Sequence, residues 1–375
     1  MKIVIAPDSF KESLSAKAVA ENIAIGIKKV LPQAETLQIP ISDGGEGLLE
    51  ALVPACNGTL VTVTVKDPLL RPIQAQYGIL GDGTTAVVEM ATASGLELLT
   101  ETEKNPMSTS TYGTGQLIKD ALDKGCTKII VGIGGSATND GGMGMIKALG
   151  GKFLDTKGND IGEGGGALAN LHTIDCSQLD TRIAQCEFIG ACDVSNPLIG
   201  PQGASMVFAA QKGGSPEQLK QLDHNLTHYA NIIQKDLNKD IATIPGGGAA
   251  GGMGAALLTY FNAQLERGID LILETLQLET HIQDADWVIT GEGTLDQQPL
   301  YGKTIAGIAA LAKKHHVPVI AIAGKVEPNL HDLYHLGVTA TFSIVNQPMT
   351  LQEAMAQTDK LIQACVENIF RTLIA

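Results

Sequence analysis

Short runs of aliphatic and β-branched residues recur along the chain, and each is followed by a polar, glycine-rich turn and then by a helical pattern. Lys2–Ala6 is such a run, and Ser13 or Ser15 can cap the helix after it. Ile129–Val131 is another, with a helix expected to begin near Gly142. This alternation is typical of a parallel α/β sheet, which binds ligands beyond the carboxyl ends of its strands.

The middle of the chain has a different pattern of hydrophobic and polar residues. Val61, Val63 and Val65 alternate with threonines, as in a half-exposed strand, and 81–83 is a predicted hairpin turn. The first pattern returns after about residue 281. We therefore expect an α/β fold with a doubly wound domain formed by residues 1–58 and 282–375. A second, mixed-sheet α/β domain, residues 59–281, is inserted into it.

Two further expectations concern glycine-rich segments, because glycine commonly ends regular structure. Trp287–Thr290 is a predicted strand, and Gly291–Asp296 is the polar turn expected after it. The glycine run 245–254 is expected to open a helix that ends near Arg267.

Composition excludes several classes of protein. The 375 residues carry a formal net charge of −14, which argues against a nucleic-acid binder and an anionic membrane surface. No run approaches the roughly 18 apolar residues of a membrane span, and the amino-terminal apolar run is too short for a signal peptide. A cytoplasmic protein is expected. The 6 cysteines form no C-x-x-C pair. A homo-oligomer is left open.

A relaxed dinucleotide fingerprint, Gly132-x-Gly134-x-x-Ala137, has Asp155 about 20 residues after it. It leaves an NAD-dependent hydroxy-acid dehydrogenase as one alternative. The polar side chains that crowd the loop, and the short helix expected after it, argue against that alternative. A non-catalytic nucleotide-binding protein is the other alternative.

Gly302-Lys303-Thr304 is similar to the end of a P-loop. Gln297 stands where that motif requires glycine, so this is not a Walker A sequence. Lys303 nevertheless remains a candidate for contact with phosphate at the start of a helix.

Carboxylates follow many of the predicted strands, beside glycine or small polar residues. They are Asp8, Asp43, Glu46, Asp140, Asp193, Glu292 and Asp296. Phosphoryl transfer uses such groups, since carboxylates hold Mg²⁺ and accept the hydroxyl proton, while lysines and backbone amides neutralise phosphate. The histidines lack metal-ligand spacing, and no Gly-x-Ser-x-Gly elbow occurs. These residues favour a kinase over a serine hydrolase.

Seven motifs follow one another in the order of a known family. They are Pro7–Ser15, Asp43–Gly47, Gly132–Gly142, Cys192–Leu198, Gln211–Gly213, Gly248–Gly252 and Ile289–Gly293. With them the chain resembles the class I bacterial glycerate kinases, although Thr294 stands where many relatives have arginine. The resemblance implies ATP-dependent phosphorylation of D-glycerate in an inter-domain cleft, with the 2-hydroxyl favoured over the 3-hydroxyl. It also implies a flavodoxin-like domain interrupted by a domain of restriction-endonuclease-like topology.

The resemblance and the positions at strand ends together suggest roles for individual residues. Asp193 or Asp296 is the expected general base, with Lys11 as a further catalytic residue. The expected glycerate-binding residues are Ser9, Lys11, Asp43 and Lys303. The expected Mg²⁺ ligands are Asp43, Asp140 and Glu292. The expected ATP-binding residues are Gly134, Gly135, Ser136, Thr138, Asn139, Gly251 and Gly252.

Overall fold

The computed structural model describes residues 1–10, 12–41, 47–296 and 303–374. The chain divides into two compact units. Unit 1 consists of residues 1–43 and 269–375, and unit 2 of residues 44–268. The boundaries predicted from sequence were at residues 58 and 282.

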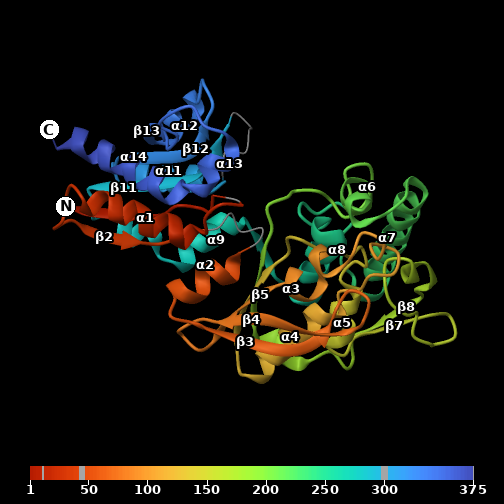
Figure 1. The fold of residues 1–375 in the computed structure, drawn as a ribbon. Coiled ribbons are helices and arrows are strands. Elements are labelled where there is room, and N and C mark those ends of the chain that lie inside the picture. Colours follow the sequence, from red (N-terminus) through yellow and green to blue (C-terminus); the bar gives the residue numbers. More distant parts are fainter. Residues whose placement is uncertain (11, 42–46, 297–302, 375) are drawn as a thin grey trace. The chain divides into compact units, whose positions relative to one another are not determined.

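Unit 1 contains a five-stranded sheet in the order β13-β12-β11-β1-β2, with every pair parallel (Figure 1). The strands are β1 (Lys2–Ile5), β2 (Glu35–Gln38), β11 (Trp287–Leu295), β12 (Val319–Val326) and β13 (Val338–Ser343). Ile3 and Val4 point to opposite faces of the sheet and both are fully buried. Both faces are therefore covered, which explains why these strands are almost continuously aliphatic.

Helices cover this sheet. They are α1 (Ala16–Lys28), α9 (Gly268–Thr275), α10 (Leu278–Ile282), α11 (Lys303–Lys314), α12 (His331–Leu336), α13 (Leu351–Ala356) and α14 (Thr358–Leu373). The predicted cap of α1 is confirmed at Ser15, whose Oγ accepts a hydrogen bond from Ala18 N. Gly26 brings α1 close to α14, since a Cβ there would lie 2.9 Å from Val366 Cβ.

The predicted turn at Gly291–Asp296 is wrong, because β11 continues through Leu295. Thr294 pairs with Lys325 of β12, and this neighbouring strand supplies partners for the backbone groups that a turn would leave unpaired. Close packing against β12, and not a turn, requires glycine at position 291. A Cβ at this position would lie 2.4 Å from the carbonyl oxygen of Ile322.

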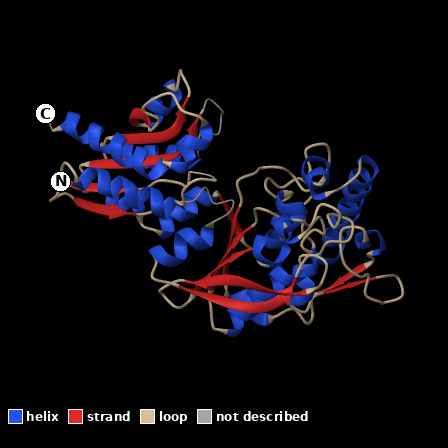
Figure 2. Cartoon of the chain, viewed as in Figure 1, coloured by secondary structure: helices blue, strands red, loops and turns tan. Residues whose placement is uncertain are grey.

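Unit 2 contains a mixed six-stranded sheet in the order β10-β9-β6-β5-β4-β3. Strands are drawn in red in Figure 2. The strands of this sheet are β3 (Thr59–Lys66), β4 (Pro72–Ile79), β5 (Thr85–Glu89), β6 (Lys128–Gly132), β9 (Glu187–Ala191) and β10 (Gln264–Glu266). The first three are antiparallel and the rest pair in parallel. The predicted hairpin at 81–83 is confirmed. A separate pair consists of β7 (Lys152–Leu154) and β8 (Thr173–Asp175).

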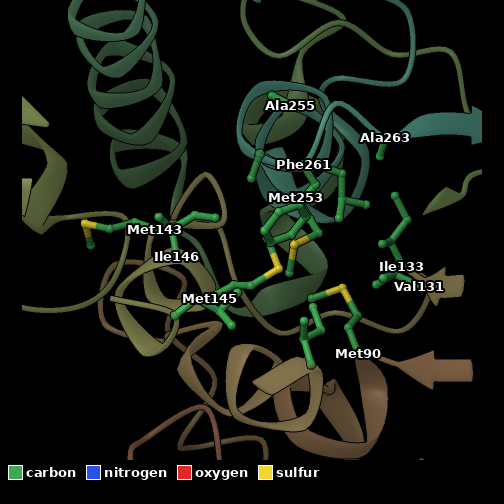
Figure 3. Close-up of a cluster of buried hydrophobic side chains, with 14 of the residues drawn as sticks. Met90, Val131, Ile133, Met143, Met145, Ile146, Met253, Ala255, Phe261 and Ala263 are labelled. Atoms are coloured by element: carbon green, nitrogen blue, oxygen red, sulfur yellow. The ribbon is translucent and has the colours of Figure 1, made fainter. Parts of the chain in front are cut away.

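The α-helices of unit 2 are α2 (Leu48–Ala55), α3 (Ala91–Ser94), α4 (Tyr112–Asp123), α5 (Met143–Ala148), α6 (Ala204–Phe208), α7 (Pro216–Leu237) and α8 (Ala249–Tyr260). All of these helices except α2 contribute buried side chains to an aliphatic and methionine-rich core. Figure 3 shows Met90, Met145 and Met253 gathered in this core, and all three are fully buried. Methionine adapts its shape to irregular gaps, which suits a core with few aromatic residues.

The helix expected to run to Arg267 ends earlier. Phe261 is the carboxyl-terminal cap of α8, and Asn262 follows with φ of 50°. The next residues form β10, in which Leu265 pairs with Gly190 of β9. A strand of three residues is too short for hydrophobic periodicity to indicate it.

No helix within the described residues combines the length and the hydropathy needed to cross a bilayer.

Candidate functional site

Residues 134–142, called here the glycine loop, connect β6 to α5 at the carboxyl edge of the unit 2 sheet. Gly135, Gly141 and Gly142 have φ values of 66°, 64° and 76°, a conformation that favours glycine. Gly135 is half-buried, whereas residues 136–140 are buried. The loop therefore combines an accessible beginning with an interior lined by polar side chains.

The glycine loop has backbone N–H groups for which the described residues supply no hydrogen-bond acceptor. These groups belong to Gly134, Gly135, Ser136, Thr138 and Asn139. The loop is held instead through neighbouring groups, because Leu96 N donates to Gly135 O and Ala137 N donates to Ser94 O, both at 2.9 Å. Successive N–H groups in such a turn form a concave anion-binding site.

The carboxylate of Asp140 is buried and shapes the end of this loop. Its Oδ2 accepts hydrogen bonds from Thr111 N at 2.9 Å, Thr111 Oγ1 at 2.8 Å and Gly144 N at 3.1 Å. Its Oδ1 accepts one from Gly142 N at 3.1 Å. Burial raises the pKa of Asp140, and the bonds from Thr111 and Gly144 oppose that rise. These contacts account for the aspartate without a metal ion, and its role as a Mg²⁺ ligand stays a prediction.

Lys212 lies against the same loop, and the residue-based assignment of site residues missed it. Its side chain is 1% exposed, and Nζ donates to Ser136 Oγ and to Thr138 O, each at 2.7 Å. Burial lowers the pKa of Lys212 to about 7, and the charge of Asp140 opposes this shift. Lysine is normally exposed, so the sequence gives no reason to expect this side chain to be buried. The only signal in the sequence is that Lys212 belongs to the Gln211–Gly213 motif.

Two side-chain oxygens of the loop are buried and have no hydrogen-bond partner among the described residues. They are Thr138 Oγ1 and Asn139 Oδ1. The amide nitrogen of Asn139 donates to Ser205 Oγ at 2.9 Å, which fixes the orientation of that amide. An unsatisfied buried polar atom is uncommon in a folded protein. Both residues were predicted to contact ATP.

The second glycine run interrupts α8 and packs directly on the glycine loop. Gly251 and Gly252 have φ values of 70° and 96°. A Cβ on Gly251 would lie 2.1 Å from Thr138 O, and one on Gly252 would lie 2.7 Å from Gly141 Cα. Close packing between the two backbones thus explains both glycines, and their predicted contact with ATP is untested.

Asp193 emerges at the same edge of the unit 2 sheet as the glycine loop. It follows β9, which pairs with β6 through Ala191 and Gly132. Its side chain is half-buried, and its Oδ1 accepts a hydrogen bond from Gly268 N at 3.1 Å. The structure therefore brings one candidate general base and the glycine loop to neighbouring strand ends.

In unit 1, Asp8 follows β1 and is oriented by two donors. Its Oδ1 accepts from Ser9 N at 2.6 Å, and its Oδ2 accepts from Thr304 Oγ1 at 3.0 Å. Its own N–H donates to Gly291 O at 2.8 Å, so Asp8 lies beside the segment of β11 that carries Glu292. Both carboxylates are half-buried. The unit 1 sheet thus carries two neighbouring carboxylates, one just after the end of β1 and one within β11.

Asp296, the other candidate base, comes directly after β11 and is half-buried. Asp296 interacts electrostatically with Lys325 of β12. The pKa of Lys325 is raised mainly by its 2.8 Å hydrogen bond to Glu327, with a smaller contribution from Asp296. Asp296 therefore lies at a half-buried position near the Lys325–Glu327 pair.

Some predicted site residues cannot be placed. Lys11, Asp43 and Glu46 lie outside the described residues, and so does the side chain of Lys303, the first residue of α11. Among the residues that are described, no group of three or more His, Cys, Asp and Glu side chains is arranged to hold a metal ion.

The chain is similar to known proteins over its whole length. The sequence profile of the glycerate kinase family matches residues 3–374. The chain is 50% identical to the glycerate kinase of Bacillus subtilis (strain 168), with 98% of this chain and 97% of that protein aligned. It is 49% identical to the glycerate 2-kinase of Escherichia coli (strain K12), with 100% and 98% aligned.

A solved structure agrees with these matches. The crystal structure of "putative glycerate kinase 2" from Salmonella typhimurium LT2 superposes with a TM-score of 0.92 at 48% sequence identity. The alignment covers 100% of this chain and 98% of that one. The chain belongs to the glycerate kinase family.

Proposed function

We propose that the protein transfers the γ-phosphoryl group of ATP to the 2-hydroxyl of D-glycerate, forming 2-phosphoglycerate and ADP. The observation that carries this proposal is the glycine loop, whose N–H groups at Gly134, Gly135 and Ser136 have no acceptor among the described residues. Such groups suit the oxygens of a nucleotide phosphate. The choice of the 2-hydroxyl rests on the name of the E. coli relative, glycerate 2-kinase.

The proposed reaction is an in-line displacement at phosphorus. The glycerate hydroxyl oxygen forms a bond to the γ-phosphorus as the bond to the β,γ-bridging oxygen breaks, and ADP leaves. The hydroxyl proton passes to a carboxylate. We assign this role to Asp193, because it emerges beside the glycine loop, and Asp296 is the alternative base.

Glycerate binding is assigned to polar residues at the carboxyl edge of the unit 1 sheet. Lys11 and Lys303 would neutralise the glycerate carboxylate or the transferring phosphate, and Ser9 and Asp43 would bind glycerate hydroxyls. Lys303 begins α11, so any contact it makes is supported by the positive end of that helix.

The strand order of unit 1 supports this choice of edge. Numbered within the unit, the strands lie in the order 2-1-3-4-5, which is the flavodoxin-like arrangement. In such sheets ligands bind where the strand order reverses, here between β1 and β11. Asp8 follows the first of these strands, and Glu292 belongs to the second. For unit 2, the mixed sheet is compatible with the expected restriction-endonuclease-like topology.

Mg²⁺ fits the donor set at this edge. The ion is usually held by one or two carboxylates together with substrate phosphates, so a cluster of three acidic residues is not required. Glu292 and Asp43 are the proposed ligands, and Asp8 offers a further carboxylate next to Glu292. When bound, Mg²⁺ would supply positive charge that neutralises the phosphate oxygens. Asp140 remains a further predicted ligand, and its carboxylate also shapes the glycine loop.

The activity is tested by incubating the purified protein with ATP, Mg²⁺ and D-glycerate and following ADP release. Glycerate-dependent ADP is the expected result, and phosphorus NMR of the product identifies the phosphorylated hydroxyl. Nucleotide binding without turnover would contradict the proposal and favour a non-catalytic protein. An absorbance change with NAD and glycerate would favour a dehydrogenase.

The general base is tested with Asp193→Asn and Asp296→Asn. Asparagine keeps the oxygen that accepts from Gly268 N but cannot take a proton, so Asp193→Asn should preserve the fold. We expect it to lower kcat by about a hundredfold or more. If Asp296→Asn alone has that effect, the base is Asp296.

A further inference from the structure

We propose that Lys212 is a positioning residue for nucleotide binding. Its Nζ fixes the glycine loop and, when protonated, supplies a buried positive charge behind the N–H groups that receive phosphate oxygens. This inference rests on the proposed function, because it concerns the same loop, and it adds a residue that lies outside the predicted site. Lys212 acts through the loop and does not itself touch the nucleotide.

The contacts of Lys212 join distant parts of unit 2. Its Nζ donates at 2.7 Å to Ser136 Oγ and to Thr138 O, one a side chain and the other a main-chain group of the glycine loop. The lysine ends a short 3₁₀ turn, Ala210–Lys212. Gly213 follows with φ of 90°, and a Cβ there would lie 2.3 Å from the carbonyl oxygen of Lys104. The turn is therefore packed closely against the backbone of Lys104.

The charge of Lys212 is not neutralised by a direct ion pair with any described residue. The partners of its ammonium are a hydroxyl and a carbonyl, both uncharged. The Asp140 carboxylate interacts with Lys212 electrostatically but not through a hydrogen bond. It accepts its hydrogen bonds from Thr111, Gly142 and Gly144. On the segment packed against Gly213, Lys104 pairs with Glu101. A buried cation is costly unless it is compensated, so its retention suggests an anion nearby in function.

The loop in front of Lys212 independently points to a ligand. The N–H groups of Gly134 and Gly135 meet no acceptor among the described residues. Thr138 Oγ1 and Asn139 Oδ1 are buried polar atoms that also lack a partner there. Unused donors on the accessible side and a cation on the buried side together make an electrostatically positive cradle. Charges act more strongly on each other away from bulk water.

The test compares Lys212→Met and Lys212→Arg with a matched control, Lys147→Met. Lys147 is also a largely buried lysine of unit 2, with a side chain 10% exposed. It bonds at 2.7 Å to Asp160 and Glu163, outside the glycine loop. The measurements are the Kd for ADP by calorimetry, KM for ATP and for glycerate, kcat, and the denaturation midpoint. ADP is the probe, so binding is measured apart from turnover.

We expect Lys212→Met to raise the Kd for ADP and the KM for ATP by about tenfold or more, because the glycine loop loses both hydrogen bonds from Nζ and the positive charge behind it. The KM for glycerate should stay within about twofold. Lys212→Arg should recover part of the affinity, and Lys147→Met should lower stability without changing the Kd for ADP. If Lys212→Met does not fold, Lys212→Gln keeps a donor, removes the charge and gives the same comparison.

An unchanged Kd for ADP in folded Lys212→Met or Lys212→Gln would overturn the inference, as would an equal rise in both KM values. These outcomes leave the proposed function intact. Failure of the unmodified protein to bind ADP would instead contradict the proposed function.

Discussion

Thr304 Oγ1 donates a hydrogen bond of 3.0 Å to Oδ2 of Asp8, which joins the first turn of α11 to the end of β1. Thr304 is fully buried, whereas Asp8 is half-buried. The other carboxylate oxygen of Asp8 accepts from Ser9 N at 2.6 Å. A buried hydroxyl thus holds a carboxylate at the edge proposed to receive glycerate.

Replacing Thr304 by valine should remove this donor while preserving the shape of the side chain. A hydrogen bond to a charged group contributes about 1.5–3 kcal/mol, so we expect Thr304→Val to lower the free energy of unfolding by up to that amount. Thr304→Ser keeps the hydroxyl and is the control. Urea titration of the three proteins provides the measurement. A loss for Thr304→Ser as large as that for Thr304→Val would contradict this prediction, because serine retains the hydroxyl that donates to Asp8.

Close contact between the two glycine-rich segments predicts a large effect for Gly251→Ala. Gly251 and Gly83 have similar φ values, 70° and 72°, but only Gly251 is crowded, because an added Cβ would lie 2.1 Å from Thr138 O. A Cβ added at Gly83 would have no atom of the described residues within 4 Å. We expect Gly83→Ala to cost about 1 kcal/mol and Gly251→Ala several times more. Thermal denaturation should separate them, and equal shifts in Tm would contradict the packing argument.

The unpaired hydroxyl of Thr138 gives a prediction in which stability and binding diverge. Removing a buried polar atom that has no partner among the described residues should be neutral or stabilising by about 1 kcal/mol, so Thr138→Val should not lower Tm. If the loop uses this hydroxyl for the nucleotide, the same variant weakens ADP binding. Calorimetry and thermal denaturation on one preparation check both statements, and a clear drop in Tm would show that the hydroxyl has a structural partner.

Lys212 predicts a pH dependence of stability. Its pKa falls from 10.5 to about 7 on folding because of burial. Between these values the unfolded state binds more protons, so the contribution of this group to stability rises with pH. Below about pH 7 both states are protonated, and the burial cost is fully present. The stability of the unmodified protein relative to Lys212→Met should therefore increase from about pH 6 to about pH 9. The urea denaturation midpoints of both proteins at the two pH values measure this difference in stability. A difference that decreases as the pH rises would contradict the prediction.

Much of the local architecture could be predicted from residue patterns. The helix capped at Ser15, the hairpin before β5 and the glycine loop between β6 and α5 all depend on neighbours in sequence. So does the expectation that polar residues cluster at the carboxyl ends of parallel strands. Backbone propensity and side-chain periodicity act over a few residues, which is the range that a sequence pattern reports.

The secondary structure predicted from sequence was wrong in two segments that pair with a strand distant in sequence. Gly291–Asp296 has the composition of a turn, yet most of it is strand because β12 pairs with it as far as Leu295. Leu265 belongs to β10 because β9 lies beside it. In both segments the deciding hydrogen bonds come from residues distant in sequence, and glycine content alone is a poor guide to strand ends.

The sequence by itself determined that this chain builds α/β sheets, one parallel and one mixed, with carboxylate- and glycine-rich segments at their edges, because those features follow from local spacing. Only the tertiary structure decided that Lys212 is buried against Ser136, 76 residues away in the chain, and that Gly251 packs on Thr138. Burial and close backbone contact depend on which distant segments meet. No pattern of neighbouring residues encodes that meeting directly.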